Sequence, residues 1–184
     1  EAILLEPKLS MPYNDLGIHY CHNGDYTRGL QYYDKALELE PDNPDYLFNI
    51  VQTYMINYPD VQKLRKWKKS KVYKEAMKLS KKAVTLSKDD FELAQDYALN
   101  FFAAENFDVK ADWGDAAEAW QYARGLARSD AERFNAWLNE ARVWMRLKDS
   151  GKARACLDES VKIQPDSPVA KRLLEELVSG KVGE

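Results

Sequence analysis

The sequence predicts an all-α protein, a right-handed α-α superhelix (solenoid) made of helix-turn-helix repeats. Pro7 and Pro41 lie 34 residues apart, and each closes a stretch of the form Ala-hydrophobic-x-Leu-acidic-Pro. Between these prolines, apolar residues follow helical spacing on both sides of the turn at Asn23-Gly24-Asp25. A period of this length indicates a pair of helices stacked on copies of itself, because one pair is too small to bury its apolar face alone.

The first complete unit, residues 10–43, resembles the tetratricopeptide repeat. That repeat places an aromatic residue at position 4, Leu-Gly at 7 and 8, Tyr at 11, a small residue at 20, an aromatic at 24, Ala at 27 and Pro at 32. The unit departs from this pattern only in using Gly29 as its small residue, which keeps the helices close and weakens the second helix by about 1 kcal/mol relative to Ala. The matching residues are Tyr13, Leu16, Gly17, Tyr20, Tyr33, Ala36 and Pro41.

The resemblance extends in register along nearly the whole chain. The fourth unit matches to an intermediate degree, with Glu140 where the family prefers Leu. The chain is therefore interpreted as a fragment of a longer array of tetratricopeptide-type repeats. Its expected parts are 1–9, the end of a preceding repeat; 10–43, repeat one; 44–90, repeat two with a basic insertion at 57–70; 91–130, repeat three with a short insertion at 106–112; 131–166, repeat four; and 167–184, a C-terminal capping helix and tail.

Composition fits a folded chain with a continuous core. Hydrophobic residues make up 45% and charged residues 31% of the sequence, which excludes the composition of a disordered chain. No window approaches the roughly 20 apolar residues that a membrane-spanning helix needs, so we expect no membrane span.

The sequence carries little that could support catalysis. His19 and His22 lie three residues apart on one predicted helix, but no further ligand follows at metal-binding spacing. No Gly-rich phosphate loop or nucleophile motif is present. We therefore expect no catalytic residue, no metal, no cofactor and no enzymatic activity from this chain.

The resemblance implies that function lies on the concave face, which in the family is lined by defined positions of each first helix. Here those positions mix amides with apolar side chains, which suits an extended peptide because Asn and Gln satisfy its backbone groups. The alternative is a solvated groove in which a few of these residues touch the next repeat. The candidate peptide-binding residues are Asn14, Ile18, Phe48, Asn49, Gln52, Gln95, Asp96, Leu99, Asn139 and Arg142.

Some tetratricopeptide domains hold the acidic C-termini of chaperones with a carboxylate clamp of Lys, Asn and Arg. Of the corresponding positions in this chain, only Asn49 matches the clamp. Glu92 and Asp96 would repel a carboxylate. The sequence therefore argues against a clamp and favours a neutral or basic ligand.

Residues 63–82 contain ten Lys or Arg and one Glu, although the whole chain has a net charge of −3. We expect a second helix lengthened at its N-terminal end, or a break near Lys69-Ser70 into two helices. This basic arm is expected to be a solvated helix face or to dock on an acidic protein surface; nucleic acid is not an expected partner. The arm residues singled out are Lys63, Arg65, Lys66, Trp67, Lys68, Lys69 and Lys71.

The sequence thus predicts a non-catalytic protein-protein interaction scaffold that binds a peptide or protein segment in its concave groove, as a monomer or with weak self-association. The alternative is a self-association or assembly module within a larger polypeptide, with the basic helical arm 60–82 docking on an acidic partner surface. A further possibility is an enzyme whose catalytic domain lies outside this segment. The function rests on resemblance, since one fold supports many functions.

Overall fold

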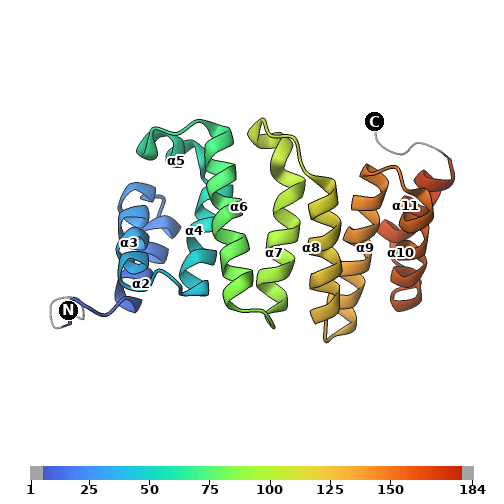
Figure 1. Cartoon of the computed structure of the whole chain (residues 1–184), viewed down its shortest axis with the longest axis horizontal. Helices are drawn as coiled ribbons and strands as arrows, with labels where there is room; N and C mark the ends of the chain where they lie inside the picture. Colours follow the sequence, from blue (N-terminus) through green and yellow to red (C-terminus); the bar gives the residue numbers. More distant parts are fainter. Residues whose placement is uncertain (1–5, 180–184) are drawn as a thin grey trace. The chain divides into compact units, whose positions relative to one another are not determined.

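The computed structural model describes residues 6–179, which contain ten α-helices, one 3-10 helix and no strand (Figure 1). Residues 1–5 and the tail at 180–184 lie outside the described residues, so most of the predicted end of a preceding repeat is not described. The chain divides into two compact units. Unit 1 comprises Glu1–Lys88 and Ala103–Lys110, and unit 2 comprises Asp89–Phe102 and Ala111–Glu184.

Unit 1 contains two helical hairpins and one additional short helix. Four of these helices begin where a cap residue or a proline satisfies or removes exposed N–H groups, whereas α6 begins without either. For example, the Asp25 carboxylate accepts a hydrogen bond from the Arg28 backbone at 3.0 Å. The first hairpin packs α2 on α3, and the second packs α4 on α6. The helices are α2 (Met11–His22), α3 (Tyr26–Leu39), α4 (Pro44–Ile56), α5 (Tyr58–Arg65) and α6 (Lys69–Leu86).

Two glycines bring α2 and α3 into close contact. Gly17 lies against the ring of Tyr33, and a Cβ at that position would overlap the ring. A Cβ on Gly29 would overlap Cys21 Sγ and lie 3.0 Å from the Cys21 backbone nitrogen and 3.1 Å from the Gly17 carbonyl oxygen. Gly29 lowers the helix propensity of α3, but its lack of a side chain is what allows the two helices to pack this closely.

The prediction of one lengthened second helix in repeat two is wrong, because the insertion forms the separate helix α5. This helix ends at Lys66, which adopts a left-handed conformation with φ 54°, and the Trp67 N–H donates back to the Gln62 carbonyl at 3.2 Å. Helix α6 then starts at Lys69 after an extended Lys68. The predicted alternative of two helices is correct, with the break at residues 66–68.

The insertions of repeats two and three pack against each other inside unit 1. A 3-10 helix, η1 (Phe101–Phe107), follows α7 and begins before residue 106, where the sequence predicted the insertion to start. Phe107 is buried with its ring 5.0 Å from that of Tyr58 and 5.5 Å from that of Tyr73. Edge and tilted ring contacts of this kind add to the burial of apolar area.

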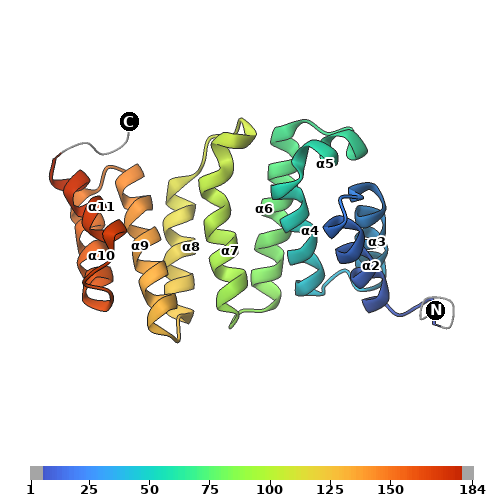
Figure 2. The ribbon, with the colours of Figure 1, turned by 180° about the vertical axis from the view of Figure 1, so that it is seen from behind.

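Unit 2 contains two hairpins, α7 with α8 and α9 with α10, followed by α11 against α10. Asp90, Asp112 and Asp149 cap their helices, and Ser129 with Glu132 forms a capping box at the start of α9. In both views, α7, α8 and α9 lie side by side in chain order (Figures 1 and 2). The helices are α7 (Phe91–Asn100), α8 (Trp113–Leu126), α9 (Asp130–Arg146), α10 (Ser150–Ile163) and α11 (Pro168–Val178).

In unit 2, Trp120 of α8 is fully buried, and Leu157 of α10 lies in a core cluster with residues of α9. Helix α11 adds Ala170 and Leu173 to it, as the predicted amphipathic spacing requires, while Val169 and Val178 remain exposed. Residues 6–179 contain helices and no strand, so the prediction of an all-α protein is confirmed.

Candidate interaction surfaces

The predicted binding residues of unit 1 lie on its two first helices, α2 and α4. The structure brings two of them together: Asn49 Nδ2 donates to Asn14 Oδ1 at 3.1 Å, and Asn14 is buried. Phe48 and Gln52 are half-buried, whereas Ile18 is 44% exposed. Asn14 thus serves the contact between helices, and Ile18 is an apolar side chain open to a ligand.

The predicted residues of unit 2 lie on α7 and α9. Leu99 is 40% exposed, Gln95 is half-buried, and Asp96 accepts a hydrogen bond from Asn100 at 3.1 Å. On α9, the Asn139 side chain donates to the Asn135 carbonyl at 2.9 Å. Its oxygen accepts from Arg142 at 3.0 Å.

Arg142 also belongs to a cluster whose other members are not among the predicted site residues. Its guanidinium carbon lies 4.8 Å from the ring centre of Phe102, and that of Arg146 lies 5.6 Å from the ring of Trp113. The two rings are 5.5 Å apart. Phe102 and Arg146 occupy positions that line the groove in this family, so the repeat pattern could have identified them. Trp113 is the first residue of a second helix, α8, and the repeat pattern does not place it in the groove.

The surroundings of Arg142 in this cluster disfavour the positive charge of its guanidinium group. Burial lowers the pKa of Arg142, and the nearby positive charges of Arg146 and Arg172 lower it further. Arg172 belongs to the last helix, α11, yet its charge acts on Arg142 of α9. We call Phe102, Trp113, Arg142, Arg146 and Arg172 the arginine-aromatic cluster.

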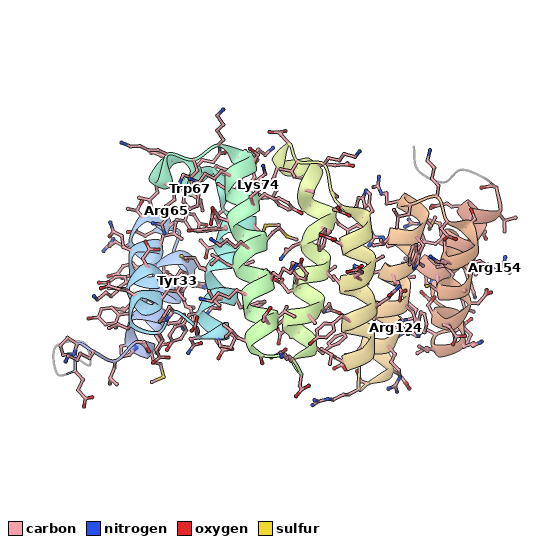
Figure 3. All side chains as sticks on the ribbon, in the orientation of Figure 1. Tyr33, Arg65, Trp67, Lys74, Arg124 and Arg154 are labelled. Atoms are coloured by element: carbon pink, nitrogen blue, oxygen red, sulfur yellow. The ribbon has the colours of Figure 1, made fainter. Side chains whose placement is uncertain are left out.

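Several residues of the predicted basic arm attach α5 to the rest of unit 1. The Arg65 guanidinium pairs with Asp34 of α3 at 2.5 Å, and the Trp67 ring packs edge-on against Tyr54 of α4 at 5.9 Å. Figure 3 labels Arg65 and Trp67. Lys69 and Lys71 lie over aromatic rings, those of Tyr58 at 5.2 Å and Trp67 at 4.8 Å. These four residues have structural contacts. Lys63, Lys66 and Lys68 are exposed, as is Lys71.

A separate row of lysines follows the exposed side of α6. Lys74, Lys78 and Lys81 recur at helical spacing and are exposed (Figure 3 labels Lys74). Among residues 6–179, no carboxylate forms an ion pair with any of them, whereas the next lysine, Lys82, pairs with Asp42 at 2.7 Å. We call Lys74, Lys78 and Lys81 the lysine face.

Glu140, which departs from the family pattern, forms a buried polar network in unit 2. Its side chain is 4% exposed and accepts from Arg124 Nε at 2.8 Å and from Trp144 Nε1 at 3.2 Å. Arg124 also stacks over the Trp137 ring at 3.9 Å, and Figure 3 places it between α8 and α9. Burial, together with the negative charge of Glu140, raises the pKa of the Cys156 thiol to about 12. The network joins two repeats and is structural.

Within the described part of the chain, no three His, Cys, Asp or Glu side chains gather where they could hold a metal ion. His19 and His22 are both exposed on α2. No helix between residues 6 and 179 combines the length and apolar character needed to cross a bilayer.

Comparisons with known proteins agree with this architecture. Two family profiles described as tetratricopeptide repeat match residues 11–43 and 103–168. A comparison with curated protein sequences found no match.

Solved structures of low sequence identity share the fold. The MamA protein aligns with a TM-score of 0.72 at 21% identity, covering 94% of this chain and 82% of MamA. The PilF protein of Pseudomonas aeruginosa aligns with a TM-score of 0.64 at 16% identity, covering 94% of this chain and 68% of PilF. YrrB, described as a TPR protein with an unusual peptide-binding site, aligns with a TM-score of 0.50 at 18% identity, covering 95% and 96% of the two chains.

Stacked helical hairpins, close-packed glycines and exposed first-helix side chains define a helical-repeat scaffold for protein-protein interaction. The chain belongs to the tetratricopeptide repeat family. Proteins of this family are in general non-catalytic, and their domains bind proteins or peptides.

Proposed function

We propose that this chain binds a peptide or protein segment along the first helices of its repeats, the surface that lines the groove in this family. Exposed apolar side chains beside amides support the proposal: Ile18 lies near the Asn14–Asn49 pair in unit 1, and Leu99 follows Gln95 in unit 2. Such a mixture offers apolar contact together with hydrogen bonds to an extended backbone. The description of YrrB as having a peptide-binding site agrees with this function.

The proposed ligand mode differs from the chaperone carboxylate clamp. Asn49 is the only residue that matches the clamp, and its amide is bonded to the buried Asn14. The clamp's two lysine positions hold Asn14 and Glu92. The positions that form the clamp in other domains therefore offer no site for a terminal carboxylate in this chain.

Selection of phage-displayed random peptides on the immobilised chain tests the proposal. We expect the selected peptides to bind Ile18→Arg or Leu99→Arg about tenfold more weakly, since a charge then replaces an apolar contact at the interface. Leu86→Arg on the second helix α6 is the matched control, because Leu86 is 43% exposed and lies outside the first helices. Equal loss in all three variants, or no loss in the first two, would contradict the proposed surface.

A second candidate function is self-association through the lysine face. Lys74, Lys78 and Lys81 are exposed and have no ion-pair partner among residues 6–179, while the chain outside residues 63–82 is acidic. A second copy of the chain therefore offers a surface of opposite charge, and such attraction is screened by salt.

Light scattering across protein concentration tests this candidate. We expect the apparent mass to rise with concentration at low salt, and Lys74→Glu/Lys78→Glu/Lys81→Glu to remove the rise. The control Lys148→Glu/Lys152→Glu changes exposed lysines of unit 2. A constant monomer mass for the unmodified chain at low salt would exclude the candidate.

A further inference from the structure

We propose that the arginine-aromatic cluster of unit 2 is the subsite at which the bound segment is selected, and that it takes an acidic side chain, Asp or Glu, next to an apolar or aromatic residue. This inference rests on the proposed peptide binding and specifies the chemistry of the ligand. It concerns one unit alone, since all five residues belong to Asp89–Phe102 or Ala111–Glu184.

Two guanidinium groups of the cluster are positioned by aromatic rings where they could bind such a ligand. Phe102 and Trp113 lie 5.5 Å apart with their planes inclined at 51°. Arg142 lies over the first ring and Arg146 over the second, so each guanidinium is held by a ring. A guanidinium held in this way loses little conformational freedom when it forms paired hydrogen bonds to a carboxylate.

Arg142 and Arg146 differ from most other arginines of the chain in having no ion-pair partner among residues 6–179. Arg28, Arg65, Arg124, Arg133 and Arg154 each form an ion pair within the chain. Within residues 6–179, no carboxylate lies within ion-pair distance of Arg142 or Arg146, and Arg142 donates only to the neutral Asn139. Arg172 has a single partner, Glu176 at 3.5 Å.

The uncompensated charges cost free energy in the unliganded chain. Arg142 experiences both Arg146 and Arg172 as like charges. A carboxylate brought to this cluster would offset the repulsion and replace lost hydration, so its binding would be more favourable than that of an isosteric amide.

A single carboxylate on a peptide fits better than a polyanion. Helix α7 of the same unit carries Glu92 and Asp96, and Glu176 lies beside Arg172, so an extended phosphate backbone would meet negative charges. The rings of Phe102 and Trp113 provide apolar contact next to the guanidinium groups. Glu92 and Asp96, which favoured a neutral or basic ligand, lie on α7, whereas the arginines of the cluster lie on α9 and α11.

Paired peptides test the inference. The probes are acetylated, amidated and fluorescently labelled peptides of sequence Ala-Phe-Glu-Leu-Glu-Phe-Ala and the same peptide with Gln for each Glu, measured by fluorescence polarisation. We expect the Glu peptide to bind about 10- to 100-fold more tightly than the Gln peptide at low salt. In Arg142→Ala/Arg146→Ala the two peptides should bind equally. Arg142→Lys/Arg146→Lys should keep part of the preference, because it keeps the charge without the planar donors.

Arg154→Ala is the matched control, because Arg154 lies on α10 and pairs with Asp158 (Figure 3). It should leave the Glu preference unchanged, and thermal melts of every variant verify folding. Equal binding of both peptides to the unmodified chain, or a Glu preference that survives the double alanine change, would overturn the inference.

The two proposals fail in different ways. If Leu99→Arg weakens both peptides but neither is preferred, the peptide surface stands and the acidic subsite is wrong. If no peptide binds, both proposals are wrong. Tighter binding of a single-stranded oligonucleotide than of the Glu peptide would also overturn the inference.

Discussion

Replacing Arg124 with alanine is expected to lower the free energy of unfolding by about 3 kcal/mol, because the Glu140 carboxylate would remain buried without its cationic partner. Glu140 is 4% exposed and accepts a hydrogen bond from Arg124 at 2.8 Å. We take the lower end of the range for buried pairs, since 33% of the Arg124 side chain is exposed. Urea denaturation followed by circular dichroism measures the loss.

A double variant separates the buried charge from simple loss of packing. Arg124→Met/Glu140→Leu removes both charges and restores the family's preferred Leu, so it should recover most of the stability lost in Arg124→Ala. Arg154→Ala, which breaks an exposed pair with Asp158, should cost less than about 1 kcal/mol. If the double variant is as unstable as Arg124→Ala, the cost does not come from an unpaired Glu140.

Replacing Gly29 with alanine is expected to destabilise the chain by about 2 kcal/mol, although helix propensity alone would stabilise it by about 1 kcal/mol. The added Cβ would overlap Cys21 Sγ and would lie 3.0 Å from a backbone nitrogen of α2, which cannot move without shifting the helix. Thermal and urea denaturation of the variant report the sign of the change directly.

Gly125 provides the matched control for this substitution. It lies near the end of α8, and no atom lies within 4 Å of where its Cβ would be. Gly125→Ala should therefore stabilise the chain by up to about 1 kcal/mol. Adding Cys21→Ala to Gly29→Ala should recover only part of the loss, because the backbone contact remains. Stabilisation by Gly29→Ala itself would mean that α2 and α3 are not closely packed there.

The sequence could predict those residues of the candidate site whose place is fixed by their position within the repeat. Position within the repeat placed Ile18 and Leu99 on exposed first-helix faces, and it located Arg142. It did not reveal that Asn14 would be buried against Asn49, because family positions describe a face and not the hydrogen bonds across it. Trp113 joined the cluster through a contact with Phe102 that no local pattern encodes.

Local patterning was a weaker guide in the insertions. The basic insertion was first predicted to lengthen the second helix of repeat two. Instead, Trp67 packs on Tyr54 and Arg65 pairs with Asp34, and the chain turns at Lys66. These contacts join residues from different helices, and together they outweigh the small cost of a left-handed lysine.

By itself, the sequence determined the helical repeats, the all-α class and the family, because apolar spacing, cap residues and the 34-residue period act locally and recur. Only the tertiary structure decided where the insertions turn, that Phe107 packs on Tyr58, and which arginines remain without a carboxylate. The physical reason is that contacts between residues distant in sequence depend on how helices pack, and one buried ring or ion pair can outweigh the propensity of a short segment.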